Sequence, residues 1–393
     1  MTGQGRVMTE GSPSWIPRAE ALQRLGVKTQ TLYAYVSRGR ISARTDPSDP
    51  RRSLYSAQDV ARLKDPSTAG APIQLEGHRP ARARDQVGVE SALTSVQDGR
   101  LTYRGRDAAV LAETWTLEQT AALLWGAEED ERPFADQKPR VDVVFPGGVR
   151  ARLLAALARR ADEDSASPGR GDRSLRREAA AIVNEMVDVV AGAGPRLYIH
   201  QRLARGWKLN ERDADLVRRA LVLSADDGLD AAALAARVAS GAGAPLSASA
   251  LAAMGAMTGP MLGGGLAQTA AWVAEARRGD PREAVRHSLA QGRDVPGFGH
   301  PHFPDGDPRA AALLNAANLP GDLLEILRVG EAMTGRRANL DLALALVARR
   351  LEMPKDGAFA LMALGRIAGW LAHAMEQARA GSPIQARLRY VGP

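Results

Sequence analysis

The sequence predicts a mainly α-helical protein with a small, separate domain at its N-terminus. Runs of Ala, Leu and Arg repeat apolar side chains at helical spacing through most of residues 149–379. Residues 15–64 combine shorter helical and extended runs, and they hold ten Lys or Arg against four Asp or Glu, a net charge of +6. Because the whole chain carries only +7, a basic domain precedes a nearly neutral body.

The basic N-terminal residues predict two helices joined by a glycine turn and followed by a hairpin. The expected elements are a helix at 18–25, a turn at 26–27, a helix at 29–38 ended by Gly39, two extended runs within 41–55 around a turn at 46–50, and a helix at 56–64. Residues 1–14, rich in Gly, Ser and Thr, are expected to be a disordered lead. Residues 65–84 contain three prolines and predict a linker.

This order of elements resembles the winged helix-turn-helix of the MerR and excisionase type. The resemblance implies that residues 15–64 bind DNA, with positions on or beside the recognition helix at Lys28, Gln30, Thr31, Tyr33 and Arg38. It places Arg51 and Arg52 on the wing, where they would face phosphates. The alternative is a small packing domain whose basic face is simply solvated.

The body is expected to begin near residue 85 with a hairpin between Ala92 and Tyr103. The predicted helices span 149–162, 174–191, 213–223, 229–240, 246–257, 264–278, 309–317, 340–352 and 357–379. Residues 238–274 carry no charge, but they consist mostly of small residues and are interrupted by Pro245 and Pro260. Close-packed buried helices explain them better than a membrane span, so no membrane partner is expected.

The composition excludes several kinds of chemistry. The chain has no cysteine, so it cannot form a disulfide, a thiolate nucleophile or a cysteine metal site. No metal site is expected. The N-terminal residues lack the basic-then-apolar order of a secretion signal. Together these features favour a cytoplasmic protein.

The stretch from Pro296 to Arg309, PGFGHPHFPDGDPR, carries the strongest functional signal. Gly297 and Gly299 allow a tight backbone turn around His300. The planar guanidinium of Arg309 follows shortly after and suits a carboxylate. A constrained imidazole near such an arginine suggests a site for a small organic acid. The alternative is a turn-rich loop with an incidental histidine.

This stretch resembles the citrate synthase signature, Gly-aromatic-Gly-His followed by Asp-Pro-Arg-Ala. Further stretches that fit the family's order are Ser95–Gly105, Leu221–Val238, Gly259–Gly264, Asn339–Asp341, Gly365–His373 and Arg387–Pro393. The resemblance covers residues 85–393 and implies an all-helical, dimeric body with a large subdomain and a small one at about 265–355. It also implies the condensation of an acyl-CoA with a 2-oxo acid, without a metal or a bound cofactor.

The resemblance implies a role for each matching residue. Asp341 stands at the position of the base that removes a proton from the acyl group, and His300 at the position that polarises the ketone. Arg309 and Arg366 stand at positions that bind carboxylates. The alternative is an Asp that caps a helix, a loop histidine and two structural arginines.

Four positions depart from the family pattern. Leu262 replaces the histidine that stabilises the enolate, and Pro304 replaces a basic residue expected to meet the phosphates of CoA. In the element Ser224–Asp227 both family histidines are missing, and a carboxylate at Asp227 would repel a dianionic oxo acid. Gln385 replaces an arginine that reaches the partner subunit's site. These changes indicate a retained fold with altered or lost chemistry.

Two hypotheses follow. The chain is either a divergent citrate or methylcitrate synthase, or a DNA-binding regulator whose body senses a small 2-oxo or tricarboxylic acid or an acyl-CoA. The matching residues favour an enzyme or a retained ligand pocket, whereas the departures and the basic head favour a regulator. A homodimer is expected, and a hetero-oligomer with an intact homologue is the alternative that would restore activity.

Overall fold

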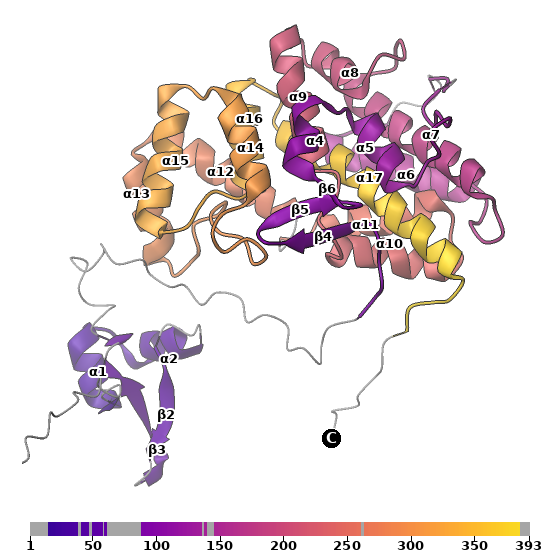
Figure 1. Cartoon of the computed structure of the whole chain (residues 1–393). Coiled ribbons are helices and arrows are strands. Elements are labelled where there is room, and N and C mark those ends of the chain that lie inside the picture. Colours follow the sequence, from indigo (N-terminus) through magenta and orange to yellow (C-terminus); the bar gives the residue numbers. More distant parts are fainter. Residues whose placement is uncertain are drawn as a thin grey trace, which may run out of the picture. The chain divides into compact units, whose positions relative to one another are not determined.

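The computed structural model describes residues 15–37, 41–46, 49–57, 59–60, 88–135, 137–139, 145–260 and 263–385. The chain folds as two compact units, with the main boundary near residue 82. Figure 1 shows an N-terminal unit of mixed helix and sheet and a mainly helical body. The predicted fold class is therefore confirmed.

The N-terminal unit is a three-stranded antiparallel sheet with two helices packed on it. Its elements are β1 (Trp15–Pro17), α1 (Arg18–Leu25), α2 (Thr29–Ser37), β2 (Ala43–Asp46) and β3 (Asp49–Ser56), with strand order β1-β3-β2. Gly26 ends α1 with φ 67°, a left-handed conformation that favours glycine. Leu32, Ile41 and Tyr55 are buried in its core with Ile16.

The predicted elements of this unit are present with small changes at their ends. Strand β1 was not predicted, and α2 ends at Ser37. The helix expected at 56–64 is seen at residues 57, 59 and 60, where the hydroxyl of Ser56 accepts from the backbone N–H of Asp59 at 3.2 Å. Gly39, residues 1–14 and residues 61–87 lie outside the described part of the chain.

The body opens with a small antiparallel sheet and continues as helices. The sheet contains β4 (Thr94–Gln97), β5 (Arg100–Tyr103) and β6 (Arg106–Asp107). The helices are α4 (Ala108–Thr114), α5 (Leu117–Leu124), α6 (Val149–Glu163), α7 (Asp172–Ala191), α8 (Ile199–Gly206), α9 (Glu211–Leu223), α10 (Ala231–Gly241), α11 (Leu246–Met257), α12 (Gly263–Arg278), α13 (Pro281–Ala290), α14 (Pro308–Ala317), α15 (Gly321–Thr334), α16 (Leu340–Arg350) and α17 (Gly357–Ala380).

Helix α17 runs through the centre of the body. It packs against α5, α7, α9, α10, α11 and α16, and nearly all of its side chains are buried. Two glycines let the end of α9 and the following turn approach it closely. A Cβ on Gly365 would lie 2.6 Å from the Cβ of Ser224, and one on Gly369 would overlap the carboxylate of Asp226.

Helix α17 is also the one helix in the described part of the chain that is long and apolar enough to cross a membrane. The most apolar segment of this helix is entirely buried inside the body, as is typical of the core helix of a globular fold. The described residues of the uncharged stretch 238–274 instead form parts of three helices, α10, α11 and α12. Pro245 is the N-cap of α11, as expected of a residue that interrupts a helix.

Candidate functional site

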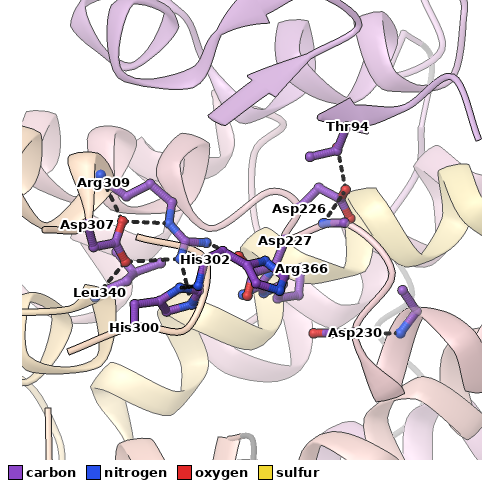
Figure 2. A network of polar contacts seen from close by, with 12 residues as sticks. Thr94, Asp226, Asp227, Asp230, His300, His302, Asp307, Arg309, Leu340 and Arg366 are labelled. Carbon is purple, nitrogen blue, oxygen red and sulfur yellow. Dashed lines mark hydrogen bonds and ion pairs between the residues drawn. The ribbon is translucent and has the colours of Figure 1, made fainter. Parts of the chain in front are cut away.

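The site is assembled from four parts of the chain that are distant in sequence. The turn after α9 supplies Asp226 and Asp227, and the loop before α14 supplies His300. Arg309 lies in the first turn of α14, and Arg366 lies in the middle of α17. Figure 2 shows these side chains converging on one polar cluster.

Arg309 is fixed by the Asp-Pro-Arg unit of which it is the last member. Its side chain is buried, with 1% of the residue exposed. Its Nε and Nη2 donate to the two carboxylate oxygens of Asp307 at 2.9 and 3.0 Å. Asp307 also caps α14 and accepts from the backbone N–H of Leu340 at 3.1 Å. The guanidinium is therefore held in one orientation.

Asp227 lies between the two arginines. Its Oδ1 accepts from Nη1 of Arg309, and its Oδ2 is 2.9 Å from Nη2 of Arg366. Burial alone would raise its pKa, but the two guanidiniums outweigh burial and hold the pKa well below the ordinary range. Asp227 is therefore ionised at neutral pH. The expectation of simple repulsion was incomplete, because this carboxylate also neutralises both arginines.

The loop that carries His300 is pinned to the start of α16. Gly297 and Gly299 have φ of 90° and 80°, and a Cβ on Gly297 would lie 2.8 Å from the Cβ of Leu342. The backbone N–H of Gly299 donates to the carbonyl of Arg337 at 2.8 Å. Glycine is needed here both for its backbone conformation and for close approach.

His300 is half-buried, and burial lowers its pKa, although the carboxylate of Asp227 acts in the opposite direction. Its Nδ1 accepts from the backbone N–H of His302 at 3.2 Å, and its Nε2 lies 3.4 Å from Nη2 of Arg309. Both neighbours are donors, and a neutral ring accepts from only one of them. We assign the proton to Nε2 because the backbone N–H of His302 is the nearer donor, and the 3.4 Å contact with Arg309 is then not a hydrogen bond. His300 can thus donate a hydrogen bond from Nε2.

Asp341 is the second residue of α16, two positions after the N-cap Asn339. Burial raises its pKa to about 7, although Arg366 and Arg309 oppose this shift. A Cβ on Gly265 would lie 3.4 Å from Oδ2 of Asp341, so the carboxyl faces the first turn of α12. A carboxyl that titrates near neutral pH is suited to general-base work.

A second polar chain supports the turn that carries Asp227. The carboxylate of neighbouring Asp226 accepts from the hydroxyl of Thr94, and its Oδ1 is 3.3 Å from Nε2 of His373. Nδ1 of His373 accepts from Nε of Arg237 at 2.9 Å. Sequence reasoning missed these supports. Asp226 and His373 lie in stretches that resemble the citrate synthase family, but nothing in the sequence linked them to Thr94 and Arg237.

An open cleft of about 430 Å³ borders the cluster at Asp227. Its lining residues are Thr94, Ser95, Val96, Asp227, Gly228, Leu229 and His302. The lining residues that the structure describes include no Lys or Arg.

Other predicted site residues lie elsewhere. Gln385 is exposed at the end of the described residues, and Leu262 lies outside them. Pro304 is exposed in the His300 loop. The residues proposed for DNA belong to the N-terminal unit, where Lys28, Gln30 and Tyr33 are exposed and Thr31 is half-buried.

Three arginines complete that set. Arg51 and Arg52 both lie in β3. The side chain of Arg52 is exposed and forms an ion pair with Asp49, at 3.2 Å between Nε and Oδ2. Arg38 lies outside the described residues.

Comparison with known proteins agrees with this fold. The family model for the citrate synthase C-terminal domain matches residues 150–387. A Mycobacterium tuberculosis protein named "Putative citrate synthase 2" is 34% identical over 328 residues, which cover 75% of this chain and 87% of that protein. A 2-methylcitrate synthase of the same species is 28% identical over 399 residues, covering 86% and 96%.

A solved structure gives the same result for the fold. The citrate synthase of Thermoplasma acidophilum, in a ternary complex with carboxymethyl coenzyme A and oxaloacetate, superposes with a TM-score of 0.65. It is 19% identical, and the match covers 78% of this chain and 94% of that one. The protein described here belongs to the citrate synthase family.

Proposed function

We propose that this chain is a citrate synthase-family protein whose ability to condense an acyl-CoA with oxaloacetate is weak or lost. One observation carries the proposal: Asp227 forms ion pairs with both Arg309 and Arg366. These are the two arginines that the family resemblance assigns to substrate carboxylates. A dicarboxylate would have to compete with a carboxylate of the protein for both of them.

The parts of the site that favour residual chemistry are Asp341 and His300. In the family reaction, a carboxylate such as Asp341 would take a proton from the acyl methyl group, and the resulting enolate carbon would attack the ketone carbon of the oxo acid. Nε2 of His300 would donate a proton to the ketone oxygen as the new bond forms. Water would then cleave the thioester and release the thiol of CoA.

The sequence lacks the family's hydrogen-bond donor for the enolate. Leu262 stands at the position of the enolate-stabilising histidine, and leucine has no hydrogen-bond donor. Removal of one such preorganised donor typically slows a reaction about 100- to 1000-fold. The missing donor and the ion pairs of Asp227 with both arginines therefore lower activity in two separate ways.

Thiol release from acetyl-CoA or propionyl-CoA, measured with oxaloacetate and several other 2-oxo acids, tests this proposal. We expect turnover with oxaloacetate to be at least about 100-fold below that of an intact family member. Leu262→His alone should recover little, whereas Leu262→His combined with Asp227→His should recover more. Turnover of the wild-type protein with oxaloacetate in the ordinary enzymatic range would refute the proposal.

A second candidate function, a DNA-binding regulator, is favoured by the N-terminal unit. Residues 15–64 hold +6 of the chain's +7 net charge. Helix α2 begins directly after the turn at Gly26 and exposes Gln30 and Tyr33, the latter with 48% of its surface. Such an arrangement suits a helix that enters the major groove while the β2–β3 hairpin meets phosphates.

Fluorescence anisotropy of the full chain with duplex DNA tests the second candidate. Arg51→Ala with Arg52→Ala should weaken binding to all sequences alike, and the affinity should fall steeply as salt rises. Gln30→Ala or Tyr33→Ala should instead change which sequence is preferred. Arg282→Ala with Arg286→Ala, which removes two exposed charges from α13 of the body, is the matched control. Equal losses from both arginine pairs would contradict DNA binding by the N-terminal unit.

A further inference from the structure

The cluster around Asp227 also bears on the kind of ligand that the cleft accepts. We infer that the cleft selects a carbonyl compound with a single carboxylate over a dicarboxylate, with Asp227 as the residue that determines this selectivity. The inference rests on the proposed function, because it assumes that the cleft beside Asp227 is the acceptor site. It goes further by naming the class of ligand.

The charges of the cluster support this inference. The carboxylates of Asp227 and Asp307 face the guanidiniums of Arg309 and Arg366, so two negative charges balance two positive ones. The lowered pKa of His300 keeps its ring neutral at neutral pH. The cluster therefore has no surplus positive charge to stabilise a dianion.

Asp227 cannot easily move aside for a second carboxylate. The adjacent Asp226 is tied to Thr94 and His373, and its Oδ2 also accepts from the backbone N–H of Gly228 at 3.1 Å. These contacts fix the residues on either side of Asp227. A ligand that displaced the Asp227 carboxylate would have to distort this turn or leave a buried charge without its partners, and both are costly.

The cluster does retain some capacity to donate. Nη1 of Arg366 is buried and has no hydrogen-bond acceptor within the described part of the chain. The cleft itself offers the ring of His302 and the hydroxyl of Ser95, which shares a hydrogen bond with the hydroxyl of Thr102 at 2.9 Å. Neutral and singly charged ligands can use such donors without an extra cation.

Calorimetric titration of the full chain, without acyl-CoA, tests the inference. The probes are 2-oxobutyrate and freshly prepared oxaloacetate, which have equal chain lengths and differ in one carboxylate. The wild-type protein should bind 2-oxobutyrate at least about tenfold more tightly, because like charges oppose the second carboxylate. Asp227→Asn should shift the preference toward oxaloacetate by about tenfold or more.

Asp305→Asn is the matched control. Asp305 is exposed in the same loop as His300, so the variant removes one negative charge without touching the arginines, and its preference should equal that of the wild type. If Asp227→Asn does not fold, Asp227→Ser replaces it. The comparison of 2-oxobutyrate with oxaloacetate binding by the wild-type protein tests the inference even without a variant.

Three results would overturn the inference: tighter binding of oxaloacetate by the wild-type protein, an unchanged preference in the Asp227 variants, or no binding of either acid to the wild-type protein. Binding and turnover separate this inference from the proposed function. Tight binding of oxaloacetate without thiol release would contradict this inference and leave the proposed function standing. Ordinary release of the CoA thiol from an acyl-CoA with 2-oxobutyrate as the acceptor, but not with oxaloacetate, would leave both standing, as an enzyme with altered substrate preference.

Discussion

The side chain of Arg309 donates most of its hydrogen bonds to carboxylates of its own chain. Replacement by methionine preserves much of the side-chain volume but leaves Asp307 and Asp227 without their shared cation. Breaking a buried ion pair by removing one partner typically costs about 3–5 kcal/mol. We expect Arg309→Met to lower the free energy of unfolding by about this amount, as measured by urea denaturation.

Arg277→Met is the control for this variant. Arg277 pairs with Asp322 at 2.6 Å, but both side chains are almost half exposed. Exposed pairs contribute at most about 1 kcal/mol, so the control should change stability little. Similar losses in both variants would show that the Arg309 cluster is not especially stabilising.

Asp341 predicts a specific dependence of stability on pH. Because burial raises its pKa to about 7 in the folded protein, the folded state binds this proton more tightly than the unfolded state, where the value is near 3.8. Its contribution to stability is therefore greatest below pH 3.8 and is lost as the pH rises toward 7. Asp341→Asn removes this term. The stability of the variant relative to the wild type should rise between these pH values and level off above them, and a flat difference in paired denaturation curves would contradict the raised pKa.

The sequence placed the site residues but not their pairing. His300, Arg309, Arg366 and Asp341 could be picked out through motifs, since each lies in a recognisable stretch. The partners of Asp227 could not be predicted from spacing, because Arg309 is 82 positions away in sequence. From sequence alone, a carboxylate in place of a histidine predicts only repulsion of an anionic substrate. Its ion pairs with the two arginines become known only from the structure.

At the scale of elements, the contact between α17 and the turn after α9 is the most sensitive to change. A Cβ on Gly369 would overlap both the carboxylate of Asp226 and the carbonyl of Ala225. We expect Gly369→Ala to cost about 1–3 kcal/mol of stability, the usual range for overpacking, and to weaken ligand binding by shifting the turn. Thermal unfolding and calorimetry check the two effects.

Gly321→Ala provides the comparison for this substitution. Gly321 begins α15, and a Cβ there would meet nothing within 4 Å. Stability should change by no more than about 0.5 kcal/mol. If Gly369→Ala is equally mild, the turn has room to move and the tight packing against α17 is not important.

All nine helices that the sequence predicted for the body are present, with shifts of one to two residues at several ends. Among the described helices, α13 and α15, with ten and fourteen residues, were missed. So were α4, α5 and α8, which have only seven or eight residues. Short helices show few turns of periodicity and depend on local caps, such as the box formed by Thr116 and Gln119 at the start of α5.

At the scale of the whole molecule, we propose that two copies of the chain associate through α10 and α11. Val238 on α10 is 46% exposed, and Gly255 on α11 is also exposed. We expect the wild-type protein to sediment as a dimer at micromolar concentration. Val238→Glu should shift it toward the monomer, because a charge would be desolvated in an apolar contact.

Val110→Glu is the control for the association test, since Val110 is 61% exposed on a different helix, α4. It should leave the sedimentation coefficient unchanged. A wild-type protein that sediments as a monomer would remove the proposal of a dimer.

The hydrogen bonds between the start and the end of the body have a consequence for how the protein is made. Oε2 of Glu376, near the end of α17, accepts from the hydroxyl of Ser91 at 2.7 Å across 285 positions of sequence. Oε1 of the same residue accepts from the backbone N–H of Ala92 at 2.9 Å. During synthesis, Ser91 and Ala92 therefore lack these partners until α17 has left the ribosome, and the core of the body cannot close before then. A nascent chain stalled before α17 would expose the apolar surfaces of α7, α9 and α10 against which this helix packs.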